Sequence, residues 1–287
     1  MFSYRHGFHA GNHADVLKHI VLLQSLDYLL NKDSALTIID THAGSGIYQL
    51  DSAFAQKSME AQQGVAMLWR DGLQLPQAVS RYVQTIRRYN TDGQLLTYPG
   101  SPLLIWELLR PQDRLHLFEL HPTDQRLLQS NIRQIDHKQR IKVHVDDGFA
   151  GLKPLLPPVS RRGLVLMDPS YEMKTDYQRV YQAIADALGR FANGVYLVWY
   201  PIVALPQAHQ LPDKLRRLAN SHERAWLNVT LKVRNPSQDF KGLVASGMFV
   251  INPPYALQTE LKDIMASLVK HLGQDRGAAY TLEVQAQ

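Results

Sequence analysis

Short apolar runs alternate with longer amphipathic segments along most of the chain. The short runs are rich in Val, Ile, Leu, Tyr and Phe, which is typical of buried strands. They predict seven strands, at residues 36–40, 115–119, 141–145, 163–168, 195–200, 226–233 and 247–251. Helical periodicity between them predicts helices at residues 14–30, 122–134, 176–190, 206–218 and 257–271. Strands and helices that alternate in this way predict an α/β fold with a mostly parallel sheet covered on both faces.

Residues 50–98 interrupt this alternation. They are polar with scattered aromatic residues, and their pattern predicts helices at 59–69 and 76–89. The sequence therefore predicts a Rossmann-like domain of residues 1–49 and 99–287, with a small helical subdomain inserted at 50–98 after the first core strand. The short connection between the last two strands, residues 234–246, indicates that this final pair is antiparallel.

Composition limits the classes of protein to which the chain can belong. Its 287 residues, 45% of them hydrophobic, can bury the core of one domain with an insertion. The absence of cysteine excludes disulfides and cysteine zinc sites, and makes the reducing cytoplasm the expected location. The sequence predicts neither a signal peptide nor a membrane span. A formal net charge of +5 favours a polyanionic partner.

A glycine turn follows the first predicted strand, and ligands bind beyond the carboxyl ends of strands in an open α/β sheet. In the stretch Asp40-Thr41-His42-Ala43-Gly44-Ser45-Gly46, glycines such as Gly44 allow the backbone to approach a ligand closely. A dinucleotide site would have a third glycine where this chain has Gln49. The turn therefore favours S-adenosylmethionine, which has no pyrophosphate; a purely structural turn is an equal alternative.

Two further strand ends carry acids that suit a nucleoside. Glu119 could accept hydrogen bonds from both ribose hydroxyls, and the insertion explains its long distance from the glycine turn. An acid of Asp146-Asp147-Gly148 could bond the adenine amino group of the cofactor. The alternatives are structural: Glu119 would cap the helix that begins near Pro122, and either aspartate would be a helix N-cap.

The fourth strand ends in Asp168-Pro169-Ser170-Tyr171, which suggests chemistry at an amino group. An exocyclic adenine nitrogen is a poor nucleophile, because its lone pair is delocalised into the ring. Asp168 and the carbonyl of Pro169 could accept from its N–H groups and aim that lone pair at a methyl donor. Tyr171 could stack on a base that is single-stranded or flipped out of its helix. The alternative for Asp-Pro in this place is a plain turn.

Asn252-Pro253-Pro254-Tyr255 is a second stretch of this kind, and it matches the amino-methyltransferase tetrapeptide better than residues 168–171 do. It follows the seventh and antiparallel strand, whose carboxyl end should face the opposite edge of the sheet from the ligand crevice. We therefore interpret it as a turn.

A resemblance to a known family rests on several stretches of the chain: residues 4–19 (YRHGFHAGNHADVLKH), 40–44 (DTHAG), 98–102 (YPGSP), 119–122 (ELHP) and 157–163 (PPVSRRG). Together they closely resemble the RlmJ family of 23S ribosomal RNA adenine-N6 methyltransferases. The resemblance implies a class I, Rossmann-like methyltransferase fold, S-adenosylmethionine as cofactor and 23S rRNA as partner. It implies cofactor contacts at His19, His42, Ser101, Glu119, Asp147 and Gly148, the catalytic acceptor at Asp168, and a substrate entrance that includes Tyr4, His6 and Lys18. The family has proline where this chain has Ser170, which puts catalytic strength in question.

Other functions are kept as alternatives. The family has been linked to the use of external DNA, which would make the chain a DNA-binding or DNA-processing protein; a DNA adenine-N6 methyltransferase is a further alternative. The N-terminal histidines His6, His9, His13 and His19 could suggest a metal site, but the sequence places no acid or cysteine ligand with them. We expect no metal, and the sequence indicates no protein partner.

Overall fold

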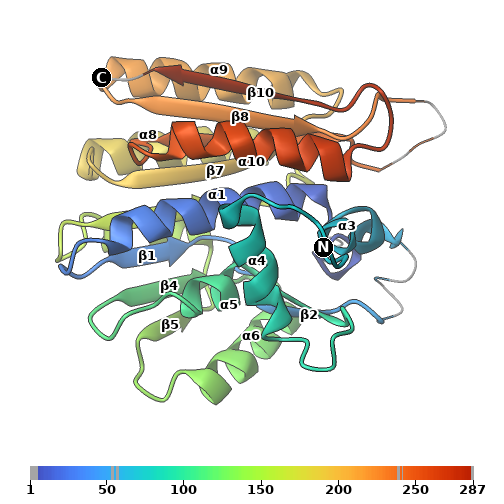
Figure 1. Ribbon diagram of the computed structural model, residues 1–287. Coiled ribbons are helices and arrows are strands. Elements are labelled where there is room, and N and C mark those ends of the chain that lie inside the picture. The colour runs from blue at the N-terminus through green and yellow to red at the C-terminus, as the bar shows by residue number, and fades with distance from the viewer. Residues whose placement is uncertain (1–5, 53–54, 56–57, 238–239, 241, 286–287) are drawn as a thin grey trace.

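The structure is a computed structural model that describes residues 6–52, 55, 58–237, 240 and 242–285. The strands are β1 (Thr37–Asp40), β2 (Ile47–Gln49), β3 (Thr97–Pro99), β4 (Arg114–Phe118), β5 (Ile141–His144), β6 (Gly163–Met167), β7 (Val195–Pro201), β8 (Trp226–Lys232), β9 (Ala245–Ile251) and β10 (Ala279–Gln285). Eight of them form one sheet in the order β10-β8-β9-β7-β6-β1-β4-β5 (Figure 1). The other two, β2 and β3, form a small antiparallel pair.

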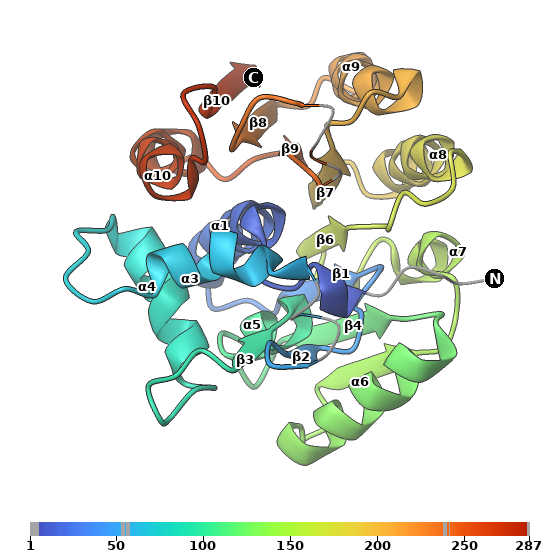
Figure 2. The same ribbon diagram turned by 90° about the vertical axis from the view of Figure 1, so that its right-hand side faces the viewer.

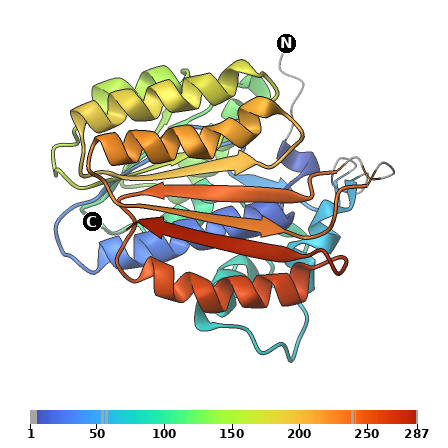
Figure 3. The same ribbon diagram turned by 90° about the horizontal axis from the view of Figure 1, so that it is seen from above.

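The helices cover both faces of the sheet. They are α1 (His13–Leu30), α3 (Val65–Leu68), α4 (Gln77–Arg87), α5 (Ser101–Trp106), α6 (Pro122–Ile135), α7 (Gly148–Leu152), α8 (Thr175–Arg190), α9 (Pro206–Ser221) and α10 (Leu257–Leu272), with short 3-10 helices η1 (His6–Phe8), η2 (Glu60–Gln63) and η3 (Lys153–Leu155). Figures 2 and 3 show α8 and α9 on one face of the sheet and α1 and α10 on the other. None of the helices in the described part of the chain has the length and apolarity needed to span a membrane.

Alternate residues of a strand pack into the two apolar clusters on opposite faces of the sheet. In β6, Leu164 and Leu166 pack into the cluster around α1, whereas Val165 and Met167 pack into the cluster around α8 and α9. Successive side chains of a strand point to opposite faces, so a strand that is covered on both faces must be apolar throughout. This explains why β6, buried at every position, reads as an uninterrupted apolar run.

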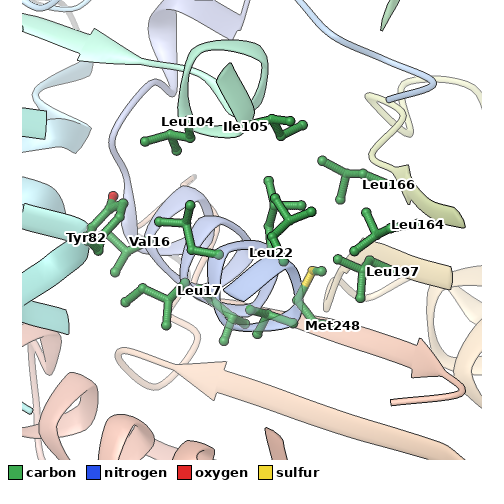
Figure 4. Packing of buried hydrophobic residues seen from close by; sticks show 14 of the residues in the cluster. Val16, Leu17, Leu22, Tyr82, Leu104, Ile105, Leu164, Leu166, Leu197 and Met248 are labelled. Carbon is green, nitrogen blue, oxygen red and sulfur yellow. The ribbon is translucent and has the colours of Figure 1, made fainter. Parts of the chain in front are cut away.

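Helix α1 lies inside the molecule instead of on its surface. Its residues from His13 to Leu26 are all buried. Figure 4 shows its apolar side chains between those of α4 and α5 on one side and those of β6, β7 and β9 on the other. A helix that is buried all round has no polar stripe, so its charged residues must find partners within the protein.

The predicted α/β fold with a mostly parallel sheet is confirmed, but the sheet has eight strands where the sequence predicted seven. Strands β5, β4, β1, β6 and β7 are parallel, and β9 is antiparallel to both β7 and β8, as the short final connection indicated. The unpredicted strand is β10, which pairs with β8 at the edge of the sheet. Most of its residues are exposed, so it lacks the apolar run that marks a buried strand.

The inserted segment is helical, although one predicted helix is divided. Where the sequence predicted a helix at 59–69, η2 and α3 are separated by Gly64. A Cβ at Gly64 would lie 2.1 Å from the carbonyl oxygen of Gly11, so a larger residue does not fit there. Val65 and Tyr82 of the insertion belong to the same apolar cluster as α1. The division of the chain into a main domain and a subdomain stays a prediction.

Candidate active site

A cavity of about 400 Å³ lies beyond the carboxyl ends of β1, β4, β5 and β6. Volumes of this order suit a nucleoside-sized ligand. Most of the predicted site residues line this cavity: His6, Lys18, His19, His42, Gly44, Ser101, Glu119, Asp147, Gly148, Asp168 and Pro169. Tyr4 lies outside the described residues. The structure thus brings together residues that are as much as 163 positions apart in the sequence, from His6 to Pro169.

Two glycines allow close contacts in the wall of this cavity. Gly44 has a φ of +61°, and a Cβ there would lie 2.1 Å from the hydroxyl of Tyr48. A Cβ at Gly148 would lie 1.9 Å from the carbonyl oxygen of Thr41. A larger residue therefore fits at neither position: at Gly44 it would meet the side chain of Tyr48, and at Gly148 the backbone of the loop after β1.

Glu119 is fixed by two backbone donors. Its Oε2 accepts from the backbone N–H of Gly44 at 2.8 Å, and its Oε1 accepts from that of His121 at 2.7 Å. Burial raises the pKa of Glu119, although these two hydrogen bonds oppose the rise. The alternative that Glu119 caps α6 is wrong, because the capping side chain is that of His121. Glu119 instead joins the loops after β1 and β4, and its remaining lone pairs are left for a ligand.

Asp147 is the N-cap of α7, as one alternative predicted. Its carboxylate accepts from the backbone N–H of Phe149 at 2.9 Å and pairs with the guanidinium of Arg179. Burial alone would raise the pKa of Asp147, but Arg179 holds it below its usual value. The Arg179 Cζ also lies 4.3 Å from the centroid of the Phe149 ring. Arg179 therefore stabilises both side chains at this end of the cavity.

Asp168 is the last member of a series of paired charged side chains that begins at His6. Lys18 pairs with Asp168 and, at 2.8 Å, with Asp15, whose other oxygen accepts from His6 and from the backbone N–H of Gly11, both at 2.9 Å. Burial alone would lower the pKa of Lys18, but Asp15 and Asp168 raise it well above its usual value. Burial alone would raise the pKa of Asp15, but His6 and Lys18 hold it well below its usual range.

His19 and His42 lie in the cavity wall. Burial lowers the pKa of both, in His42 to about 3. The Nδ1 of His19 bonds to the hydroxyl of Tyr98 at 2.7 Å, and the buried Nε2 has no hydrogen-bond partner among the residues that the structure describes. A buried imidazole nitrogen without a partner is unfavourable, so a ligand that bonds to it would relieve a cost.

The N-terminal histidines bind separate partners. Contrary to the expectation from sequence, acids do accompany them: His6 bonds to Asp15 and His9 to Glu60. His13 donates from Nε2 to the carbonyl oxygen of Leu243 at 2.8 Å. Among the residues that the structure describes, no three His, Asp or Glu side chains are grouped to hold a metal ion.

Tyr171 is placed differently from the prediction that it stacks on a base in the cavity. Its side chain is buried against Tyr177 and Trp199, and its hydroxyl donates to the carbonyl of Trp199 at 2.6 Å. It does not line the cavity beside Asp168. In this conformation the ring supports the turn from within the core.

The competing tetrapeptide at 252–255 lies away from the cavity. Asn252 follows β9, whose last residue Ile251 pairs with Tyr196 near the start of β7. Its amide donates to the carbonyls of Ala192 and Gly194 at 2.8 and 2.7 Å. The stretch therefore forms a turn at the opposite edge of the sheet, as the antiparallel direction of β9 requires.

Three residues that hold predicted site residues in place were missed from the sequence. Asp15 could have been recognised, because it lies three positions before Lys18 on the same predicted helix. Asp40, fully buried, accepts from the hydroxyl of Ser101 at 2.6 Å and so fixes a predicted cofactor contact. Arg179 had no signal in the sequence, since only the packing of α8 against α7 brings it to Asp147.

A family model described as "Ribosomal RNA large subunit methyltransferase D, RlmJ" matches residues 33–284. The chain belongs to the RlmJ family. It is 46% identical over 268 residues to "Ribosomal RNA large subunit methyltransferase J" of Escherichia coli (strain K12), with 92% of each chain covered. It is 44% identical over 284 residues to the protein of the same name from Haemophilus influenzae, with 99% of this chain and 98% of that one covered.

A solved structure is similar to this chain over nearly its whole length. Protein LPL1258 from Legionella pneumophila superimposes with a TM-score of 0.86 and is 36% identical, with 96% of this chain and 98% of that chain covered. The match spans the insertion as well as the sheet. The RlmJ-family chain therefore shares its whole architecture with that protein.

The buried acid at the end of β1 predicts a pH dependence of stability. Burial raises the pKa of Asp40 to about 6, against the opposing hydrogen bonds from Ser101 and from the backbone N–H of His42. The folded protein thus binds this proton more tightly than the unfolded chain, and Asp40 makes stability fall as pH rises from about 4 to about 6. Between pH 4.5 and 7 this loss should be about 2 kcal/mol, at ~1.4 kcal/mol per pH unit.

Urea unfolding of the wild type and of Asp40→Asn at both pH values measures this contribution. Between pH 4.5 and 7, we expect the wild type to lose about 2 kcal/mol more stability than Asp40→Asn, which has no carboxyl group to titrate at this position. Equal pH dependence in the two proteins would show that Asp40 titrates at its ordinary value.

Proposed function

We propose that this RlmJ-family protein transfers a methyl group from S-adenosylmethionine to N6 of an adenine in 23S rRNA. The observation that carries the proposal is the position of Asp168 at the end of β6, in the wall of a nucleoside-sized cavity. The names of the two curated relatives support rRNA of the large subunit as the substrate. They give no support to the alternatives in which DNA is bound, processed or methylated.

The residues of the cavity fit the cofactor. Glu119 is oriented by two backbone donors with lone pairs left for ribose hydroxyls. The Nε2 of His19, which has no partner in the described part of the chain, suits a carboxylate or an amino group. The exposed Asp146, beside the N-cap Asp147, adds an acceptor for an adenine amino group. S-adenosylmethionine supplies, when bound, an electrophilic methyl group on a sulfonium.

Asp168 would act on the acceptor amine. Its Oδ2 pairs with Lys18, and its Oδ1 has no hydrogen bond within the described part of the chain. In the proposed mechanism Oδ1 and the carbonyl of Pro169 accept from the N6–H groups, so that the nitrogen lone pair is directed at the methyl group. The proton that nitrogen loses after transfer would leave through Asp168 or water.

The acceptor base would enter next to Asp168. A second cavity of about 160 Å³ shares His6, Lys18, Asp168 and Ser170 with the main one and is lined by Trp199. An adenine inside a duplex cannot reach a recessed carboxylate, so the proposal requires a single-stranded or flipped-out base. Tyr4, outside the described residues, remains part of the proposed entrance.

The proposed function is tested by the Asp168→Ala variant. We expect wild type to methylate adenine N6 in 23S rRNA, and Asp168→Ala to lose turnover while its affinity for S-adenosylmethionine stays within a few-fold, because a contact made in the transition state appears in the rate. Methyl transfer to naked rRNA fragments, assembled subunits and DNA is assayed in parallel, with mass spectrometry of the product and calorimetry for the cofactor. Wild-type transfer to DNA alone, or no cofactor binding, would reject the proposal.

Glu119 carries a separate prediction. We expect Glu119→Ala to weaken binding of S-adenosylmethionine by about 1.5–3 kcal/mol, the range for hydrogen bonds to a charged group. Calorimetry measures this loss, and Glu223→Ala, on the loop after α9, serves as the control. Unchanged affinity would mean that Glu119 only joins the two loops.

Ser170 replaces the proline of the family without removing a proposed catalytic atom. The proposed acceptor carbonyl belongs to Pro169, and Ser170 itself is exposed at the cavity. We expect Ser170→Pro to keep or modestly raise the rate and to increase stability by about 0.4–1 kcal/mol, because proline restricts the unfolded chain. Steady-state kinetics and thermal unfolding check both effects. An inactive wild type beside an active Ser170→Pro would show that this chain has a disabled site.

A further inference from the structure

The inserted segment holds the chain that leads into the active site. Just after the described N-terminal turn, the carbonyl of Gly11 accepts from the backbone N–H of Val65 at 2.8 Å. The hydroxyl of Ser58 donates to the carbonyl of Phe8. Gly64 packs so closely that a Cβ there would overlap the backbone of Gly11. Residues 6–12 are thus attached to the insertion at several points before α1 begins.

Glu60 is the charged group of this attachment. Its carboxylate lies 3.0 Å from Nδ1 of His9 and accepts from Nδ2 of Asn12 at 2.8 Å. Asn12 is 6% exposed, and its other amide atom, Oδ1, accepts from the backbone N–H groups of Ala14 and Asp15 at 2.9 Å. One buried side chain therefore connects the insertion to the first turn of α1.

The chemistry of these groups determines which way the Asn12 amide points. An ionised carboxylate only accepts hydrogen bonds, so Glu60 requires the NH₂ end of the amide to face it. The oxygen end must then face the N-terminus of α1, where unpaired backbone donors need an acceptor. Without Glu60, the buried NH₂ group would lack this acceptor, and the orientation of the cap would be less fixed.

The same turn of α1 carries the charges that hold Asp168. The backbone N–H of Asp15 bonds to Asn12, and the Asp15 carboxylate pairs with Lys18, which pairs with Asp168. Asn12, Asp15 and Lys18 thus link Glu60 to the carboxylate of Asp168. A shift of the α1 N-terminus would displace Lys18 and alter the direction of that carboxylate.

We propose that Glu60 is a positioning residue for methyl transfer, acting through Asn12 on the Asp15–Lys18–Asp168 chain. The inference rests on the proposed function of Asp168. It gives the insertion a role in aligning the acceptor site, separate from any contact that the insertion makes with RNA. Lys18 and Asp168 line the main cavity, but the loops after β1, β4 and β5, which carry the proposed cofactor contacts Glu119 and Asp147, are not part of this chain of contacts.

The test measures methyl transfer to the rRNA fragment that wild type modifies, with full-length Glu60→Ala, Glu60→Gln and the control Gln62→Ala, an exposed residue of the same 3-10 helix. We expect Glu60→Ala to lower kcat about tenfold, the scale of a lost hydrogen bond to a charged group, with the Kd for S-adenosylmethionine within about twofold of wild type. Glu60→Gln should recover to within about threefold of wild type, because its side-chain oxygen can still accept from Asn12. Gln62→Ala should match wild type.

A double-mutant cycle separates positioning from a general loss of stability. Asn12→Ser keeps a capping oxygen for α1 but removes the amide that faces Glu60. If Glu60 acts through Asn12, Glu60→Ala should change kcat by less than about twofold in the Asn12→Ser background. The cycle compares rates of folded variants, which circular dichroism identifies.

Either of two results would overturn the inference while the wild type stays active: a Glu60→Ala kcat equal to that of Gln62→Ala, or the full loss of rate in the Asn12→Ser background. Equal losses of kcat and cofactor affinity in Glu60→Ala would also reject it, since they would indicate a structural role. A wild type that methylates no adenine would instead reject the proposed function, on which this inference rests.

Discussion

The ion pair between Lys18 and Asp168 links the buried helix α1 to the end of the central strand β6. A lysine that is almost fully buried is costly unless charges of opposite sign compensate it, and Asp15 and Asp168 together do so. The pairing requires α1 to lie against the sheet with its first turns at the carboxyl ends of the strands. The apolar packing of Leu17 and Leu22 of α1 favours the same position of the helix against the sheet. The Lys18–Asp168 ion pair therefore couples the position of α1 on the sheet to the position of the Asp168 carboxylate.

Several residues that line the cavity also form hydrogen bonds with other parts of the protein. Glu119 joins two loops, Asp147 caps α7 and Ser101 donates to the buried Asp40. Such contacts hold each side chain in one orientation before any ligand arrives. Preorganisation of this kind lowers the cost of binding and strengthens electrostatic effects in a site that excludes water.

The insertion also helps to hold α1 in place. Its apolar residues, among them Val65 and Tyr82, share the core of α1, and its polar residue Glu60 contacts the segment that precedes the helix. A segment with these contacts cannot be removed without exposing α1. Residues 50–98 therefore take part in the packing that holds α1, and with it Lys18, in place.

The sequence by itself determined the parts of this protein that depend on local patterns. Apolar runs predicted the core strands, a short connection predicted the antiparallel pair β8–β9, and acids at strand ends predicted much of the cavity lining. These succeed because strand ends of a parallel sheet meet at one edge, whatever the details of packing. The N-terminal resemblance added His19 and Lys18, which periodicity alone would have assigned to an ordinary helix.

Only the tertiary structure decided the rest. Edge strand β10 is too exposed to be marked by hydrophobicity, Tyr171 turns into the core because Trp199 and Tyr177 surround it, and Arg179 reaches Asp147 from a helix 32 positions away. Each of these depends on the surfaces that distant elements present to one another, and such surfaces exist only once the chain has folded.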